Sequence, residues 1–153
     1  MTLSKNGEIA LAVLLAVLVV LPALMLGLIY GAAPYQVLPG EPVRKAADVA
    51  GISVVSVRGT LWNMTGAEGG KTYTLTDTEG DTAIIATQAF DSAASRDAAV
   101  RLYNAHAPGK GLLVGRMMVV GQYLVYVTPA NSPIFAQIAP ALQQAASVAG
   151  AQS

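Results

Sequence analysis

The chain of 153 residues is long enough for about one ordinary domain, and 54% of its residues are hydrophobic, with a mean hydropathy of +0.52. Nine lysines and arginines balance nine aspartates and glutamates, so there is no basic field to attract nucleic acid and no acidic tail. The absence of cysteine excludes a disulfide framework, a thiol nucleophile and a thiolate metal site.

An uninterrupted apolar run occupies residues 9–30, with the sequence IALAVLLAVLVVLPALMLGLIY. At about 1.5 Å per residue it would be about 33 Å long as a helix, which matches a hydrocarbon core of about 30 Å. We therefore predict a single transmembrane helix, bent near Pro22. The alternative is a buried helix of a soluble core, but such segments are usually shorter.

A cleaved secretory signal is a second interpretation of the same run. Lys5 supplies a positive charge before it, and residues 31–33 are small enough for a signal peptidase. Two features favour an uncleaved signal-anchor instead. The apolar run is longer than the usual h-region of about 7–15 residues, and Pro34 would follow the scissile bond directly.

Gly7 and Glu8 precede the apolar run, and this arrangement resembles the leader of a prepilin. The resemblance implies a pilin-like filament subunit, in which a short basic segment is removed and the apolar N-terminal helix becomes the assembly core. It covers only these few residues. The glutamate directly follows the glycine, whereas in type IV pilins it lies several residues into the mature helix.

The expected topology is a single pass through the cell membrane, with a cytoplasmic N-terminus and an extracytoplasmic C-terminal domain. Arg44 and Lys45 follow the span, so the count of positive charges does not set the orientation. The orientation instead follows from size, because the N-terminal tail is too short to fold, whereas the C-terminal part has the length of a domain. A short basic tail before a long apolar run is also the usual order of a signal-anchor. The predicted parts are a tail (1–8), a transmembrane helix (9–30), a stalk (31–46) and an α+β domain (47–150).

A continuous helix through the stalk is prevented by Pro34, Pro39, Gly40 and Pro42. They favour a stiff, extended segment that holds the domain off the bilayer, with Tyr30 and Tyr35 at the level of the lipid headgroups. A loop packed on the domain is the alternative. Residues 44–50 form either a short helix or the approach to the first strand.

The first half of the domain predicts a strand, a hairpin and a helix. Residues 52–62 are rich in β-branched side chains, and Gly59 is a candidate bulge. Residues 72–77 and 82–90 form a hairpin around a turn at 77–81. A helix then begins at a cap, Asp91 or Ser92, and continues to about residue 107. Its predicted apolar face consists of Ala99, Leu102, Tyr103 and His106.

The second half repeats this order. Two β-rich runs, 112–120 and 122–128, are separated by Gly121, and a helix follows over residues 133–149. The signals for this helix are Ser132 as N-cap, Pro133 in the first turn, Pro140 at a bend or at the true start, and Gly150 as C-cap. The predicted fold class is α+β, with an antiparallel sheet of about five strands and two helices packed on one face.

The search for catalytic chemistry identifies no constellation of acid and base residues. His106 lies on the predicted apolar face, where a core or boundary histidine is expected. The acidic cluster of Asp77, Glu79 and Asp81 lacks EF-hand spacing and predicts a solvated turn. Gly66, Gly69 and Gly70 lack the order of a phosphate-binding loop. We therefore predict a protein that is not an enzyme and that binds neither metal nor cofactor.

Asn63 begins an N-x-[ST] sequence, Asn63-Met64-Thr65, in a glycine-rich connection, so it is a candidate N-glycosylation site.

Apolar residues occupy both faces of the strand at 123–128, which implies a second covering surface besides the two helices. Tyr123, Leu124 and Tyr126 are therefore the predicted interaction surface, with the chain's own stalk as an alternative cover. The expected function is a membrane-anchored, non-catalytic module for protein interaction or assembly. The expected partners are the lipid bilayer and either a second copy of the chain or another membrane protein, and nucleic acid is not among them.

Overall fold

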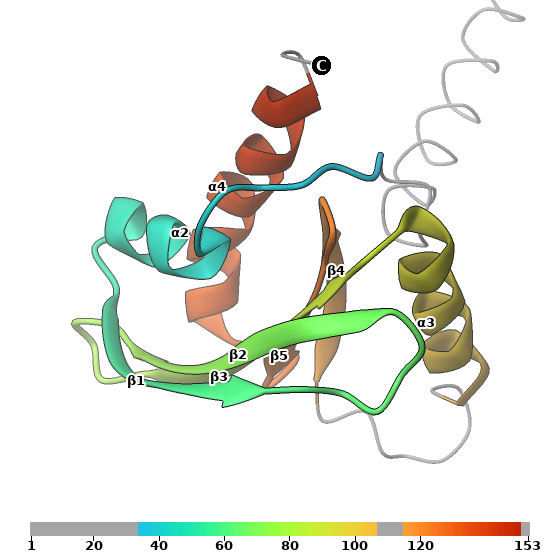
Figure 1. The fold of residues 1–153 in the computed structure, drawn as a ribbon. Helices are drawn as coiled ribbons and strands as arrows, with labels where there is room; N and C mark the ends of the chain where they lie inside the picture. Colours follow the sequence, from blue (N-terminus) through green and yellow to red (C-terminus); the bar gives the residue numbers. More distant parts are fainter. Residues whose placement is uncertain (1–33, 107–114, 151–153) are drawn as a thin grey trace, which may run out of the picture.

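The computed structural model describes residues 34–106 and 115–150 (Figure 1). Its elements, in chain order, are α2 (Pro42–Ala50), β1 (Ser53–Thr60), β2 (Ala67–Thr76), β3 (Thr82–Phe90), α3 (Ala93–His106), β4 (Arg116–Val120), β5 (Tyr123–Thr128) and α4 (Pro133–Gly150). The predicted transmembrane helix of residues 9–30 lies outside the described residues. Of the helices that are described, none combines the length and the apolar character needed to cross a membrane.

Five antiparallel strands form one sheet in the order β1-β2-β3-β5-β4. The predicted hairpin is present between β2 and β3, where Thr76 pairs with Thr82 across the turn. A second hairpin joins β4 to β5 through the two-residue turn of Gly121 and Gln122. Gly121 has a φ of 57°, which glycine adopts at little cost. The prediction of an α+β fold with a five-stranded antiparallel sheet is confirmed.

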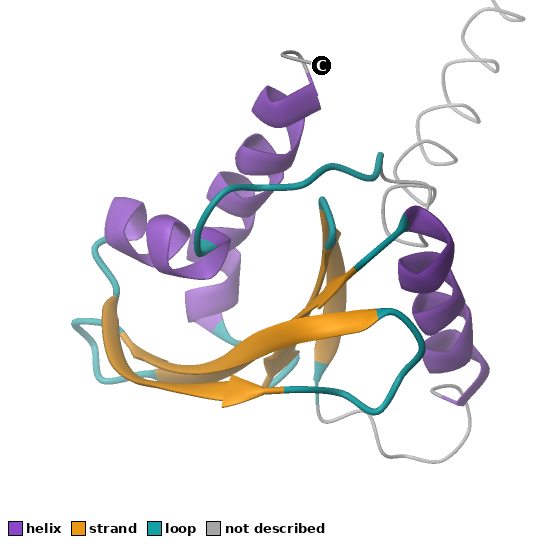
Figure 2. Cartoon of the chain, in the orientation of Figure 1, coloured by secondary structure: helices purple, strands orange, loops and turns teal. Residues whose placement is uncertain are grey.

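The helices cover both faces of the sheet (Figures 1 and 2). α2 and α4 pack on the face that carries Leu75, Ile85 and Val127. α3 packs on the opposite face, against Phe90 and Leu124. The prediction that the helices pack on one face alone is therefore wrong. The apolar side chains on both faces of the strands explain the second layer, because each face needs its own cover.

The helix α3 begins as predicted but buries a partly different face. The Ser92 hydroxyl accepts a hydrogen bond from the backbone N–H of Ser95 at 3.2 Å, so Ser92 is the side-chain cap. The buried residues of α3 are Arg96, Ala99 and Val100. The predicted apolar face is correct in part: Ala99 is buried and Tyr103 is half-buried against Tyr126 of the sheet, whereas Leu102 is 51% exposed and His106 is exposed.

Residues 34–41, within the predicted stalk, lie against the domain, as the alternative interpretation expected. Leu38 is buried, and its backbone N–H donates to the side-chain oxygen of Gln122 in the β4–β5 turn. The hydroxyl of Tyr35 donates to the carbonyl oxygen of Phe90 at 2.8 Å. The short helix predicted at 44–50 is present as α2, which begins earlier, with Pro42 in its first turn and Gly51 as its left-handed cap.

Three local predictions are also tested. The irregularity in β1 lies between Val54 and Ser56, and Gly59 pairs regularly with Lys71. α4 begins at Pro133 as expected, but the hydroxyl of Ser132 makes no hydrogen bond with any described residue, so the predicted side-chain cap is absent. The backbone N–H of Ser132 donates to the carbonyl oxygen of Pro129 at 3.1 Å, and its carbonyl oxygen accepts from the N–H of Ala136 at 3.4 Å. Pro140 lies inside α4 and does not mark its start.

Candidate functional site

A groove of about 660 Å³ lies between the edge strand β4 and the helix α4. This volume falls within the range of about 300–1,000 Å³ that is usual for ligand pockets. The walls are mainly apolar, with a few polar residues. The lining residues are Pro34, Arg116, Met117, Met118, Val119, Ala130, Asn131, Ser132, Phe135, Ala136, Ala139, Gln143, Gln144, Ala146 and Ser147.

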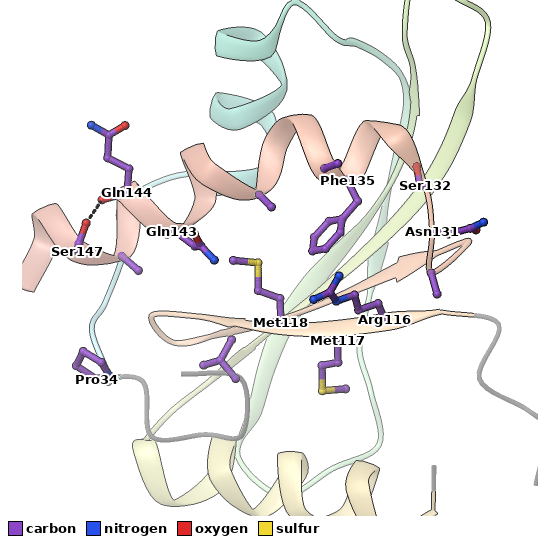
Figure 3. Close-up of a pocket in the computed structure, with 15 residues that line it drawn as sticks. Pro34, Arg116, Met117, Met118, Asn131, Ser132, Phe135, Gln143, Gln144 and Ser147 are labelled. Atoms are coloured by element: carbon purple, nitrogen blue, oxygen red, sulfur yellow. Dashed lines mark hydrogen bonds between the residues drawn. The ribbon is translucent and has the colours of Figure 1, made fainter. Parts of the chain in front are cut away.

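The groove runs along the free edge of β4. Successive residues of a strand point to opposite faces of the sheet. Figure 3 shows Met118 on the α4 side of the strand and Met117 on the other side, yet both line the groove. A cavity that touches both sides of one strand must pass around its unpaired edge. A bound molecule would therefore meet the backbone of β4 as well as its side chains.

The sheet register identifies the backbone groups at this edge. The carbonyl oxygen of Gln122 accepts a hydrogen bond from Phe90 of β3. Backbone groups alternate along a strand, so the groups of Tyr123 and Val125 point away from β3 and toward β4. Their partners on β4 are Val120 and Met118. The remaining residues of the strand, Met117 and Val119, must point their N–H and C=O groups outward into the groove.

The α4 wall is formed by Phe135, Ala136 and Ala139, on the side of the helix next to the core residues Ile134 and Ile138. The small alanines leave space beside β4. At one end of the groove, the guanidinium of Arg116 lies 5.7 Å from the centre of the Phe135 ring, which is a cation–π geometry (Figure 3). This contact holds the only charged side chain among the described lining residues against the apolar wall.

Ser132 adds a polar feature to this end of the groove. Its side chain is buried, and its hydroxyl has no hydrogen-bond partner among the described residues. An unpaired buried hydroxyl costs about 1–3 kcal/mol. A bound group that hydrogen-bonds to Ser132 would recover part of this free energy.

A second polar assembly connects the segment after the predicted membrane span to the domain. Arg96 of α3 is 1% exposed, and its guanidinium donates to the carbonyl oxygens of Gly121 at 2.6 Å and Pro34 at 3.3 Å. It also pairs with Asp97 at 2.8 Å and lies 5.6 Å from the centre of the Tyr35 ring. Arg96 thus joins α3, the β4–β5 turn and the segment that lines the groove through Pro34.

Glu41 forms the centre of a third cluster, near the start of α2. Its carboxylate accepts hydrogen bonds from Lys71, Arg44 and the hydroxyl of Tyr73. The hydrogen bonds from Lys71 and Arg44 lower the pKa of Glu41. Burial raises the pKa of Tyr73, and the neighbouring Glu41 charge raises it further. The cluster attaches the beginning of α2 to β2 and lies outside the groove.

The predicted interaction surface is divided between the two faces of the sheet. Leu124 is fully buried under α3, so it is inaccessible to a partner. Tyr126, on the same face, is half-buried and forms an edge-on contact with Tyr103 of α3 at 6.2 Å between ring centres. Tyr123 lies on the opposite face, half-buried beside the core that α2 and α4 cover, and its hydroxyl donates to the carbonyl of Gly40 at 3.4 Å.

The other residues that the sequence singled out lie apart from the groove. Asn63 and Thr65 are exposed in the connection between β1 and β2, an accessible position for the candidate glycosylation site. His106 is exposed at the end of α3, and its Nδ1 lies 2.8 Å from the carbonyl oxygen of Leu102. It is therefore not the core or boundary histidine expected from the sequence. Asp77 accepts backbone hydrogen bonds within its own hairpin turn.

Among residues 34–106 and 115–150, no group of three or more histidines, aspartates or glutamates has the arrangement of a metal site. Of the glycines considered for a phosphate-binding loop, Gly69 and Gly70 lie in β2 and pair with β3, and Gly66 lies in the turn before β2. The groove presents apolar side chains and the unpaired backbone edge of β4. Those features are suited to binding.

No family model, curated protein or solved structure matches this chain.

Sequence reasoning did not find the groove. Its walls come from β4, α4, the connection before α4 and Pro34, and these segments are not contiguous in the sequence. One signal was present in the segment RMMVV at 116–120, an apolar strand whose only charge is at its first residue. Such a strand at the edge of a sheet presents an unprotected pairing surface, but the sequence does not show which strand is at the edge.

Proposed function

We propose that this chain is a single-pass, membrane-anchored extracytoplasmic module for protein interaction or assembly, without catalytic activity, and that it binds through the groove between β4 and α4. The observation that carries the proposal is an apolar groove that follows the free backbone edge of a strand. Proteins usually protect such edges, because they readily pair with another chain. Arg116 of β4 is exposed and Met117 and Met118 are half-buried, so this part of the edge is apolar and accessible and fits a recognition surface.

The position of Pro34 supports an interaction close to the membrane. Pro34 lines the groove and lies four residues beyond the end of the apolar run at residue 30. An extended chain covers at most about 3.3–3.6 Å per residue, so Pro34 would lie within about 14 Å of the end of the span. A partner that fills the groove would meet the domain near the bilayer surface, which fits a second copy of the chain or another membrane protein.

The residue types in the groove support binding. Met117 and Met118 have flexible, polarisable side chains that adapt to the shape of a bound surface. Arg116 is the only ionisable side chain among the described lining residues, and its guanidinium packs on Phe135. General acid–base catalysis requires positioned groups that exchange protons near neutral pH, and arginine stays protonated.

The test compares two substitutions on the same helix. Ala136 is exposed and lines the groove, whereas the neighbouring Gln137 is exposed and lies outside it. Full-length wild type, Ala136→Arg and Gln137→Arg are extracted from native membranes in mild detergent, and the mass of each complex is measured by native electrophoresis and light scattering. We expect an assembly larger than the monomer for wild type and Gln137→Arg, and its loss for Ala136→Arg. A monomeric wild type, or equal behaviour of the two variants, would contradict the proposed function.

A further inference from the structure

We infer that the groove is filled by β4 of a second copy of the chain, and that the two β4 strands pair antiparallel about a two-fold axis at Met118. The two sheets would then join edge to edge, with both α4 helices on the same face. This inference rests on the proposed function, because it identifies the partner and the mode of pairing for the same groove.

The unpaired backbone groups of β4 favour an extended peptide as the occupant of the groove. Met117 and Val119 point backbone N–H and C=O groups along the free edge of β4, as the register shows. A lipid chain in the groove would cover these groups without hydrogen bonds and would leave each of them buried and unpaired, which is unfavourable. A peptide strand satisfies them and places alternate side chains on the two sides of β4.

β4 itself has the properties that its own groove requires. It is extended, and four of its five residues are the apolar Met117, Met118, Val119 and Val120. The outward backbone groups of β4 belong to Met117 and Val119. In a second copy the same two residues carry the outward groups, so they must lie opposite Met117 and Val119 of the first copy. Self-complementarity of this kind is what an isologous two-fold interface needs.

One register satisfies these conditions over the whole strand. If Met118 lies opposite Met118 of the second copy, Met117 lies opposite Val119 and Arg116 lies opposite Val120. All five residues are then paired, and every outward backbone group meets another outward group. Centring the pairing on Met117 or on Val119 also aligns outward groups, but leaves strand residues unpaired.

The two edges of the sheet differ in their protection. β1, at the other edge, contains an irregularity between Val54 and Ser56, and it carries Arg58 and Gly59 near its end. A bulge, a charge and a glycine each discourage the addition of another strand. β4 has regular pairing throughout and has Arg116 only at its first residue. The sheet is therefore open to extension at β4 and blocked at β1.

The membrane attachment is compatible with this symmetry. Pro34 lines the groove of each copy, so the two-fold axis places both Pro34 residues beside the shared interface. With the axis along the membrane normal, both segments leave the dimer at the same height. Two apolar spans that begin close together can then enter one bilayer.

Cysteine cross-linking tests the register. The chain has no cysteine, so each variant carries one thiol. Met118 opposite Met118 is a pair without direct backbone hydrogen bonds, with the Cα atoms about 4.5 Å apart, which is within disulfide range. Met117→Cys is the matched control on the same strand, because its residue lies opposite Val119. Val55→Cys, at an exposed position on β1, reports random collisions.

Full-length variants are oxidised in native membranes and separated without reductant. We expect Met118→Cys to give a band at twice the chain mass of 15.7 kDa, several-fold stronger than that of either control. The fluorescence of Trp62, the single tryptophan, verifies that each variant is folded.

Three results would overturn the inference. They are a folded Met118→Cys that stays monomeric, cross-linking of Met117→Cys or Val55→Cys at the same rate, and an adduct of Met118→Cys with a different protein. If any of these occurs while Ala136→Arg still abolishes the wild-type assembly, the pairing of two copies through β4 fails and the proposed function stands. A wild-type chain that forms no assembly at all would refute both.

Discussion

Replacement of the buried Arg96 by methionine should destabilise the fold and release the segment at Pro34. The guanidinium of Arg96 donates to the carbonyl oxygens of Gly121 and Pro34, at 2.6 Å and 3.3 Å. A hydrogen bond that involves a charged group contributes about 1.5–3 kcal/mol, and the longer of the two contributes less. Methionine fills part of the space, and the partner Asp97 keeps contact with water because its side chain is 30% exposed. The expected loss in the free energy of unfolding is about 2–4 kcal/mol.

Urea unfolding of the full-length chain in detergent measures this loss, with Trp62 as the fluorescent probe. Because m-values of small proteins in urea are about 1–3 kcal/mol/M, the midpoint should fall by about 1–2 M. Arg96→Lys should be intermediate, since one ammonium group replaces a planar group with five donors. Arg101→Met, at an exposed position on the same helix, should change stability by less than about 0.5 kcal/mol. An unchanged midpoint for Arg96→Met would refute the role assigned to Arg96.

Three further predictions concern the membrane and the pH dependence. The full-length chain should stay with membranes after high-salt and carbonate washes, and release by salt alone would contradict a spanning helix. Protease added to intact spheroplasts should remove the domain, and any glycan mass should disappear in Asn63→Gln; protection until lysis would reverse the proposed topology. Burial and the Glu41 charge raise the pKa of Tyr73, so its contribution to stability is complete below the unfolded pKa of about 10 and decreases as pH rises above it. Alkaline urea titrations should therefore show a smaller pH dependence for Tyr73→Phe than for wild type, and identical slopes would count against this explanation.

The sequence was informative where local chemistry decides the structure. Alternating side chains and a polar turn predicted the β2–β3 hairpin, and Ser92 predicted the start of α3. These features depend on neighbours a few residues apart. The number of strands and the α+β class follow from the same signals.

The side on which α3 packs could not be predicted in this way. Its buried face includes Arg96, which a hydrophobic pattern counts as solvent-exposed. Arg96 is buried because its donors meet the carbonyls of Pro34 and Gly121, which are distant in the sequence. The expected apolar face therefore matched the structure at Ala99 and Tyr103 and failed at Leu102 and His106, which are exposed. For the same reason the sequence did not show that α3 covers Leu124, which was therefore assigned to an interaction surface.

The candidate site also depends on tertiary arrangement. The strand β4 becomes accessible only because β5 pairs with β3 and places β4 at the edge of the sheet. Sequence order alone would have placed β4 beside β3. The groove then needs α4 on the adjacent face and Pro34 at its margin. None of these three contacts has a local signature.

Hydrogen–deuterium exchange at the free edge of β4 is the most direct test of the account. The backbone N–H groups of Met117 and Val119 point away from β5, so they have no partner within the described sheet. Exchange is measured with residue resolution on the full-length chain in membranes, for wild type, Ala136→Arg and Gln137→Arg. We predict that both amides are protected in wild type and Gln137→Arg and exchange rapidly in Ala136→Arg, whatever partner fills the groove. Rapid exchange of both amides in the assembled wild type would contradict the central claim that the groove along β4 is the interaction site.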